Sequence, residues 1–273
     1  MIPESGLRWL AQLLQQETGF DPAHLQPATL HYRLSVLAHK RRQRSAEALL
    51  KQLRINPEIC DKAELIESLL NYETHFFRDA SLFELLRSRI LPELLGARPP
   101  QLRIWSAACA SGQEPYSLVL IWDRHFAARA SLRLWASDVS GQALELARQG
   151  LYSRYEVDKH VPAEYRSSFD LVEDSYQLQP HFRQQARFEQ LNLLRLAQGA
   201  PAAFLPPDLD LMLMRNVLIY LAPALREKLI AMAARRLRPG GYLILGITES
   251  LVPAPPEFAP VHLDAAGGCF KKK

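Results

Sequence analysis

Acidic side chains stand at or near the ends of two apolar segments, where a small ligand could reach them. The segment Leu132–Asp138 ends in a carboxylate that could accept hydrogen bonds from both hydroxyls of a ribose, or could cap the helix that follows. The segment Leu102–Ala108 is followed by small residues and by Glu114, close to the expected start of the next helix. Small residues let a ligand approach the backbone, although a plain strand-to-helix turn would also use them. An acid at a helix start disfavours a phosphate and suits an ammonium or sulfonium group.

Amide and guanidinium side chains stand at the ends of two further segments. Asn192 stands where another buried strand should end, and its amide could pair with the edge of an adenine or form a turn. The apolar run that begins at Leu209 stops at Arg215 and Asn216, which should face a pocket or solvent unless Asn216 caps a helix. A single glycine in the first loop gives poor support to a phosphate cradle. These features describe a nucleoside site without a phosphate-binding loop, and S-adenosylmethionine (SAM) fits that description.

The segments around these residues predict the elements that hold them in place. Strands are expected at Leu102–Ala108, Leu132–Asp138, Leu209–Asn216 and Tyr242–Ile247, with helices from Glu114, over Gly141–Gln149 and over Pro223–Leu237, and a turn at Pro239–Gly241. Strands that alternate with helices predict an α/β fold with a doubly wound parallel sheet. Ligands of such sheets bind beyond the carboxyl ends of the strands, which is where the polar residues stand.

Two other regions have a different pattern. Leucines at helical spacing before about residue 70 predict an all-helical unit of about four helices. Short alternating runs over about 153–190 predict a small antiparallel β insertion, and the runs Phe258–Leu263 and Gly268–Lys271 predict a terminal hairpin. We therefore expect an N-terminal helical domain at 1–70, a linker and ligand-covering segment at 71–100 with a break at Pro99–Pro100, and the doubly wound domain with its insertion at 101–273.

Composition and charge exclude several classes of protein. The 273 residues are 48% hydrophobic and carry 33 Lys and Arg against 29 Asp and Glu, a net charge of +4, which is ordinary for a soluble globular protein. Charged residues interrupt the longest apolar stretch, and the N-terminus lacks the pattern of a signal peptide, so we expect a cytoplasmic protein without membrane insertion. The three cysteines, Cys60, Cys109 and Cys269, are too far apart for a zinc site or a disulfide framework, and no metal is expected.

Basic residues cluster in the N-terminal region. Arg33, Lys40 and Arg44 stand at i, i+7 and i+11, close to one helical stripe, and Arg41 flanks it. Such a run could be a solvated face, or a cationic groove that binds an acidic protein substrate. Nucleic acid is disfavoured as the partner because the net charge of the chain is small.

Six motifs are spread over most of the chain. They are Thr74–Asp79, Trp105–Ser117, Ala136–Val139, Asn192–Leu193, Arg215–Tyr220 and Pro239–Gly241. Their order and spacing resemble the chemotaxis receptor methyltransferase (CheR) family, and Thr248–Leu251 resembles that family's final motif. The resemblance implies a SAM-methyltransferase (Rossmann-like) domain with the β insertion and the N-terminal helices. It also implies methyl transfer from SAM to glutamate side chains in the cytoplasmic helical region of methyl-accepting chemotaxis receptors, giving the methyl ester and S-adenosylhomocysteine.

Residue by residue, the resemblance implies a SAM site and a reacting centre. The SAM-binding positions would be Thr74, Arg78, Glu114, Asp138, Asn192, Leu193, Arg215 and Asn216, and the catalytic positions Arg78 and Tyr220. In this assignment Arg78 lies beside the methyl group, Asp138 binds the ribose, and Tyr220 orients the substrate. Two positions depart from the family pattern, since Tyr72 stands where asparagine is common and Gln113 where glutamate is common.

Two other functions are compatible with these residues. A SAM-dependent methyltransferase could act on another carboxylate substrate, and a SAM-binding signalling or scaffold protein could lack turnover. Intact Thr74, Arg78, Asp138 and Tyr220 favour an active enzyme. We expect it to be a monomer.

Overall fold

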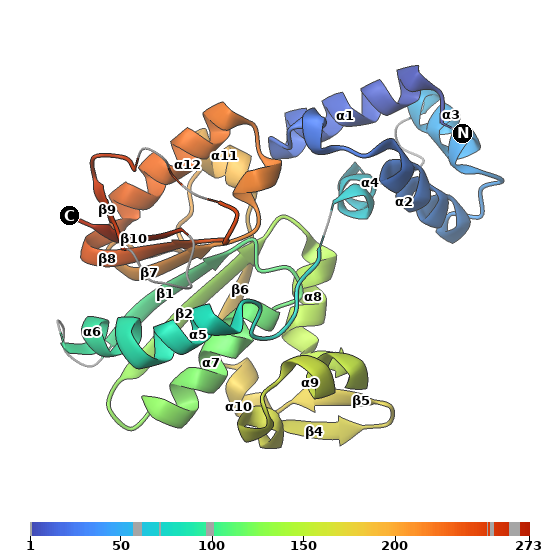
Figure 1. Cartoon of the computed structure of the whole chain (residues 1–273). Helices are drawn as coiled ribbons and strands as arrows, with labels where there is room; N and C mark the ends of the chain where they lie inside the picture. The colour runs from blue at the N-terminus through green and yellow to red at the C-terminus, as the bar shows by residue number, and fades with distance from the viewer. Residues whose placement is uncertain are drawn as a thin grey trace.

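A seven-stranded sheet forms the centre of the larger part of the molecule (Figure 1). Its strands, in spatial order, are β6 (Ala186–Gln190), β2 (Ser131–Asp138), β1 (Gln101–Ala107), β7 (Leu209–Met214), β8 (Leu237–Leu245), β10 (Cys269–Lys272) and β9 (Phe258–Pro260). The strands from β6 to β8 are parallel, and β10 is antiparallel to both of its neighbours. The doubly wound sheet and the pairing of the last two strands are therefore confirmed.

The computed structural model of the chain describes residues 2–56, 62–70, 72–96, 101–249, 251, 254–261 and 268–273. Four predicted features lie outside these residues: the break at Pro99–Pro100, Cys60, Ser250 of the final motif, and Leu263 at the end of a predicted strand.

Apolar residues on both sides of the central strands explain why helices cover the two faces of the sheet. In β1, Leu102 and Ile104 belong to one core, and Trp105 and Ala107 belong to the other. Helices α5 (Ala80–Leu85), α6 (Leu91–Gly96), α7 (Gln113–His125) and α8 (Gly141–Gln149) pack on the first face, and α11 (Leu193–Ala197) and α12 (Pro223–Arg236) on the second (Figure 1). A π-helical turn, η3 (Leu86–Ile90), joins α5 to α6. Strands of a parallel sheet are buried on both faces, so three layers follow from this pattern.

The bounds of α8 follow from its capping residues. The Ser140 hydroxyl accepts a hydrogen bond from the Ala143 N–H at 3.0 Å, and Gly150 ends the helix in left-handed backbone with φ of 63°. These are ordinary start and stop signals of a helix. The helix predicted at Gly141–Gln149 is confirmed, and it places Asp138 just before a helix N-terminus.

The β insertion has a small sheet of its own beside the main one (Figure 1). Its strands, in spatial order, are β3 (Leu151–Ser153), β5 (Ser175–Leu178) and β4 (Phe169–Val172), and both pairings are antiparallel. Short helices complete it: α9 (Arg154–His160), the 3₁₀ turn η4 (Ala163–Ser168) and α10 (Pro180–Arg183). β6 falls within the range expected for the insertion, but it pairs with β2 in the main sheet.

The N-terminal helices form a unit with a separate core (Figure 1). They are α1 (Glu4–Thr18), the 3₁₀ turn η1 (Pro22–His24), α2 (Pro27–Lys40), α3 (Ala46–Ile55) and α4 (Lys62–Leu69). Leu10, Leu34 and Leu49 are fully buried among them, as their helical spacing predicts. Across the ranges that the structure describes, no helix combines the length and apolar character needed to cross a bilayer.

The predicted turn at Pro239–Gly241 is wrong. These residues lie inside β8, which begins directly after α12. Gly240 has a positive φ of 77°, and the pairing of β8 with β7 shifts register between Leu209 and Leu211. Proline and glycine here form an irregular start of a strand, because pairing with β7 continues on both sides of them.

Candidate active site

A cleft lies at the carboxyl ends of the parallel strands, where the strand order reverses between β1 and β7. Its empty volume is about 1020 Å³ with the open mouth included. Its wall includes Ala108, Cys109 and Ala110 after β1, and Leu191 after β6. The reversal point of a doubly wound sheet is a common ligand site, which makes this cleft the candidate site of the protein.

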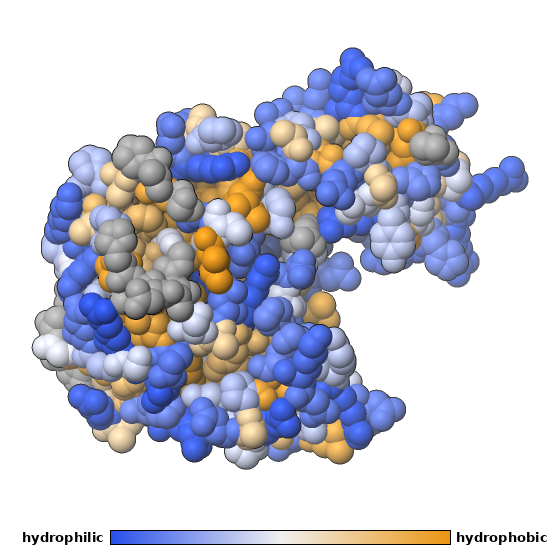
Figure 2. Space-filling model, viewed as in Figure 1, coloured by the Kyte–Doolittle hydropathy of each residue, from blue (hydrophilic) through white to orange (hydrophobic). Residues whose placement is uncertain are grey.

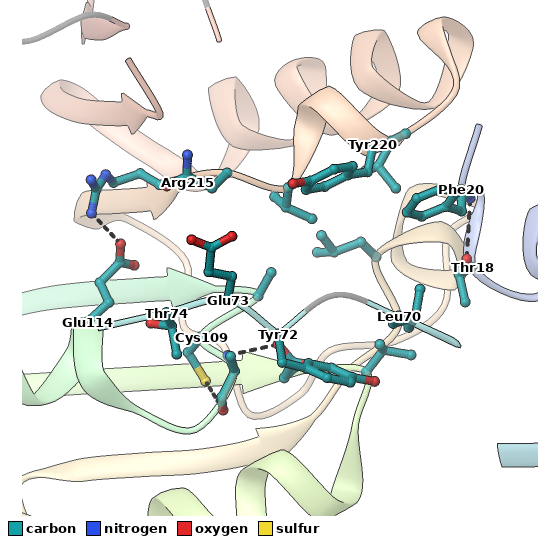
Figure 3. A pocket seen from close by; sticks show the side chains of 18 of the residues that line it. Thr18, Phe20, Leu70, Tyr72, Glu73, Thr74, Cys109, Glu114, Arg215 and Tyr220 are labelled. Carbon is teal, nitrogen blue, oxygen red and sulfur yellow. Dashed lines mark hydrogen bonds and ion pairs between the residues drawn. The ribbon is translucent and has the colours of Figure 1, made fainter. Parts of the chain in front are cut away.

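The cleft brings together every residue predicted to bind SAM or to act at the methyl group. The residues that line it include Thr74, Arg78, Glu114, Asp138, Asn192, Leu193, Arg215, Asn216 and Tyr220. Figure 3 labels Thr74, Glu114, Arg215 and Tyr220 among them. These residues come from stretches that are far apart in the sequence. Their proximity agrees with one ligand site, and the role of each residue remains a prediction.

Arg215 joins two walls of the cleft. Its side chain is 2% exposed, and its Nη1 donates to Glu114 Oε2 at 2.8 Å (Figure 3). Its Nη2 donates to the Arg78 carbonyl at 3.0 Å and to the Asp79 carboxylate. Glu114 also accepts a hydrogen bond from the Ser106 hydroxyl at 2.7 Å. Arg215 therefore connects the start of α7 to the segment that carries Arg78, and its charge is paired within the protein.

The segment around Arg78 has a constrained backbone. Phe77 and Asp79 have φ of 51° and 66°, a left-handed conformation that costs a non-glycine residue about 1–2 kcal/mol. The Phe77 N–H donates to the Ser117 hydroxyl at 2.9 Å, and Arg78 Nη1 donates to the Glu73 carbonyl at 2.7 Å. Such a conformation persists where the surroundings hold it, so Arg78 is presented from a fixed turn.

Asp138 ends β2 with both carboxylate oxygens partnered. Oδ1 accepts a hydrogen bond from the Ser140 N–H, and Oδ2 accepts one from the Ala110 N–H, each at 2.9 Å. Burial raises the pKa of Asp138 above its ordinary value, and these N–H donors oppose that rise. Each oxygen keeps a second lone pair, so the carboxylate can still accept hydrogen bonds from the hydroxyls of a ligand.

Asn192 acts as a helix cap. Its Oδ1 accepts hydrogen bonds from the N–H groups of Leu194 and Arg195 at 2.9 and 3.4 Å, at the start of α11. Its Nδ2 donates to the Glu17 carbonyl at 2.7 Å. The turn interpretation of Asn192 is therefore confirmed, and the amide is largely engaged by its own chain. A base in this part of the cleft would meet the apolar side chain of Leu193, which also lines it.

The N-terminal unit also contributes to the cleft, which the sequence did not predict. Thr18 and Phe20 line it, and the Phe20 ring stacks on Tyr220 with centroids 5.7 Å apart (Figure 3). The Asp21 N–H donates to the Tyr220 carbonyl at 2.7 Å. Phe20 and Tyr220 are 200 positions apart, and no motif signals their contact.

Most of the residues that line the cleft fall in a region that this chain shares with known proteins. A family profile described as CheR methyltransferase, SAM binding domain, matches residues 72–266. The chain is 35% identical over 206 residues to chemotaxis protein methyltransferase 1 of Pseudomonas aeruginosa, and this alignment covers 72% of this chain and 73% of the relative. It is 29% identical over 267 residues to a chemotaxis protein methyltransferase of Vibrio anguillarum, and this alignment covers 96% of this chain and 94% of the relative. The chain belongs to the CheR methyltransferase family.

As a CheR-family methyltransferase, the chain has two further cleft residues beside its first motif. Tyr72, at the position where the family commonly has asparagine, lines the cleft, and so does Glu73. The Glu73 carboxylate points into the cleft between Arg215 and Tyr220 (Figure 3). Both residues directly precede Thr74, so extending the motif by two positions would have found them.

The basic stripe expected of this CheR-family chain does not run along one helix. α2 ends at Lys40, because Arg42 adopts left-handed backbone with φ of 54°. The Gln43 N–H then bonds to the Ala38 carbonyl at 2.8 Å, which closes the helix end. Arg44 therefore lies beyond α2, and the prediction of one helical stripe is wrong.

Three of the four predicted basic residues have partners within the N-terminal unit. Lys40 and Arg41 form ion pairs with Glu64, and Arg33 Nη1 donates to the Leu69 carbonyl at 2.6 Å. Burial lowers the pKa of Arg33 from its ordinary value. Substrate binding by these residues remains a prediction, and it would have to compete with these contacts.

Proposed function

We propose that this CheR-family protein transfers the methyl group of SAM to glutamate side chains in the cytoplasmic helical region of methyl-accepting chemotaxis receptors. The products would be the glutamate methyl ester and S-adenosylhomocysteine. The observation that carries the proposal is the cleft, because most of its lining residues fall in the SAM-binding domain and Arg78, Asp138 and Tyr220 stand on its wall. The chemotaxis methyltransferases that match most of this chain support the choice of substrate.

The chemistry of the wall fits SAM better than a nucleotide with phosphates. Asp138 offers acceptor oxygens to the ribose, and the apolar side chains of Leu191 and Leu193 offer a surface to the adenine. The Arg215 charge is paired with Glu114 and Asp79, whereas the Glu73 carboxylate points into the cleft, which suits a ligand with ammonium and sulfonium groups. When bound, SAM supplies the electrophilic methyl group of its sulfonium ion.

Arg78 would orient the incoming carboxylate. Its Nη1 donates to a backbone carbonyl, that of Glu73, so its charge is not consumed by that contact. A guanidinium can hold one carboxylate oxygen by hydrogen bonding and leave the other free to attack. Because the same pairing lowers the nucleophilicity of the carboxylate, we assign Arg78 an orienting role. Tyr220, supported from behind by Phe20, would form the aromatic wall beside the substrate.

The reaction needs no general base, because a glutamate carboxylate is already ionised at neutral pH. Alignment of nucleophile and methyl group is then the main contribution open to the enzyme, and it can be worth roughly 7–11 kcal/mol. The Arg215 contacts and the constrained turn at Phe77 and Asp79 would hold Arg78 in place before the substrate arrives. Exclusion of water from the cleft would remove the solvent shell of the nucleophile.

The receptor would approach beside the N-terminal unit. Figure 2 shows a deep notch between this unit and the part of the molecule that carries the insertion. Arg42 and Arg44 are exposed in the turn between α2 and α3, on the N-terminal unit. Exposed basic residues favour encounter with an acidic receptor helix. We therefore propose that Arg44, with Arg33, Lys40 and Arg41, contacts the receptor.

Transfer of radiolabelled methyl groups to receptor-containing membranes tests the proposed function. We expect label on the receptor, released by mild base because methyl esters are base-labile, and no label on membranes without receptors. The Arg78→Ala variant should bind SAM but transfer little label. Transfer only to small carboxylic acids would favour another substrate, and SAM binding without any transfer would favour a scaffold protein.

A further inference from the structure

A buried carboxylate lies directly behind the wall of the cleft that follows β7. Glu249, from the final sequence motif, is 5% exposed. Its Oε2 accepts hydrogen bonds from the N–H groups of Asn216 and Gly246, both at 2.7 Å, and its Oε1 accepts one from the Ile219 N–H at 3.0 Å. The carboxylate therefore connects the end of β8 to the segment 216–220, which reaches the cleft.

These three hydrogen bonds compensate for the burial of a charge. A carboxylate taken out of water is costly unless hydrogen bonds replace its solvent, and bonds to a charged acceptor are stronger than neutral ones. Asn216 also has left-handed backbone with φ of 56°, a conformation that persists where the surroundings hold it. The bond from the Asn216 N–H to Glu249 is part of that support.

Gly246 leaves the space that this arrangement needs. A Cβ atom at Gly246 would lie 2.7 Å from Glu249 Oε2 and 2.9 Å from Asn216 Nδ2. Real Cβ atoms almost never come that close to another heavy atom, so a side chain there would push the carboxylate away from the segment. Gly246 itself is not in the left-handed region, so the space and not the backbone conformation requires glycine.

The opposite side of the same segment is held by the N-terminal unit. The Tyr220 carbonyl accepts a hydrogen bond from the Asp21 N–H, and its ring stacks on Phe20. Glu249 thus supplies the support on the side of the sheet. Without it, the N–H groups of Asn216 and Ile219 would lose their acceptor, and the segment would keep only weaker support there, from the bond that Arg226 Nη2 donates to the Ile219 carbonyl at 3.2 Å and from the buried Leu218 side chain.

We propose that Glu249 is a positioning residue for methyl transfer, because it holds Asn216 and Tyr220 in the wall of the cleft without touching the ligand. This role rests on the proposed function. It predicts that loss of the carboxylate lowers kcat much more than it weakens SAM binding. A side chain that served stability alone would leave kcat of the folded enzyme unchanged.

The variants Glu249→Gln and Gly246→Ala test the role in two independent ways. The glutamine amide can place its oxygen toward Asn216 and Gly246, but its NH2 group then faces the Ile219 N–H. The Gly246→Ala variant keeps the Glu249 carboxylate, but the added Cβ atom displaces it. For each folded variant we expect kcat for receptor methylation to fall by about tenfold or more, equivalent to at least about 1.4 kcal/mol, with the SAM dissociation constant changed less than about threefold. The exposed Glu257 provides the matched control Glu257→Gln, which should behave as wild type.

Hydrogen exchange of the wild-type protein gives a reading that does not depend on the variants folding. The N–H groups of Asn216, Ile219 and Gly246 should exchange slowly, and in Glu249→Gln the Ile219 N–H should exchange faster while core amides are unchanged. Fast exchange at all three in the wild type, or wild-type kcat in either folded variant, would overturn the role of Glu249. Absence of methyl transfer by the wild-type enzyme would instead refute the proposed function.

Discussion

Replacing Arg215 by lysine should loosen the cleft although the positive charge is kept. The guanidinium reaches three acceptors at once: a Glu114 oxygen, the Arg78 carbonyl and the Asp79 carboxylate. A lysine ammonium is a compact point charge and cannot bridge acceptors that a planar guanidinium spans. We therefore expect Arg215→Lys to keep one of these contacts and to lose the other two.

The size of the effect follows from the two lost contacts. Hydrogen bonds to charged groups contribute about 1.5–3 kcal/mol each, and removing one partner of a buried ion pair costs about 3–5 kcal/mol. The Glu114 and Asp79 side chains are 13% and 23% exposed, so water can partly replace the lost partner and the lower values apply. The free energy of unfolding should fall by about 3 kcal/mol. Because Glu114 and the segment that carries Thr74 lose this support, SAM binding should weaken about tenfold.

Urea unfolding and calorimetric titration with SAM measure the two effects. The matched control is Arg238→Lys, since Arg238 forms a buried ion pair with Asp210 at the starts of β8 and β7, away from the cleft. It should lose stability without losing SAM affinity. An Arg215→Lys protein within about 1 kcal/mol of wild-type stability and with unchanged SAM affinity would refute the role of Arg215.

Four further predictions concern the cleft and other parts of the molecule. Arg78→Ala should lower kcat more than about tenfold while the heat of SAM binding changes little, and near-normal turnover would contradict its orienting role. Asp138→Asn should weaken SAM binding by about 1.5–3 kcal/mol, because the ribose loses a charged acceptor, and a titration with unchanged affinity would remove Asp138 from the site. The His160 ring stacks on His75 with centroids 4.3 Å apart, and burial first and His75 second lower the pKa of His160. The unfolded chain then binds a proton at His160 more readily than the folded chain does. The free energy of unfolding should therefore fall as pH drops through about 6.5 toward the lower pKa of His160 in the folded protein. His160→Gln should flatten this pH dependence, as measured by urea unfolding. The rate of receptor methylation should fall as the salt concentration rises from about 20 to 200 mM, and it should fall more in wild type than in Arg44→Gln. Rates that do not change with salt would argue against a basic docking face.

Features with a strong local or topological signal could be predicted from the sequence. The bounds of α8 follow from Ser140 and Gly150, which act within a few residues of the helix ends. The gathering of Asp138, Asn192 and Arg215 in one cleft follows from topology, since parallel strands bring their carboxyl ends to one edge of the sheet. The first inference needs only residues that are neighbours in the sequence, and the second needs only the order of elements along the chain.

Two local signals were misleading because a competing interaction outweighed them. Proline and glycine at 239–241 favour a turn, but they lie inside β8, which pairs with β7 on both sides of them. The spacing of Arg33, Lys40 and Arg44 fits one helix, but the left-handed Arg42 ends α2 before the last of them. Spacing alone does not reveal where a helix stops or whether a strand finds a partner.

The order of strands and helices, and with it the kind of ligand site, was determined by the sequence, because hydrophobic periodicity and capping are short-range properties. Only the tertiary structure decided how the site residues are used. It placed Arg215 between two carboxylates, made Asn192 a helix cap, and brought Phe20 and Glu249 to opposite sides of one segment. These contacts join residues far apart in the chain, and packing of whole elements sets them, so no spacing rule along the sequence contains them.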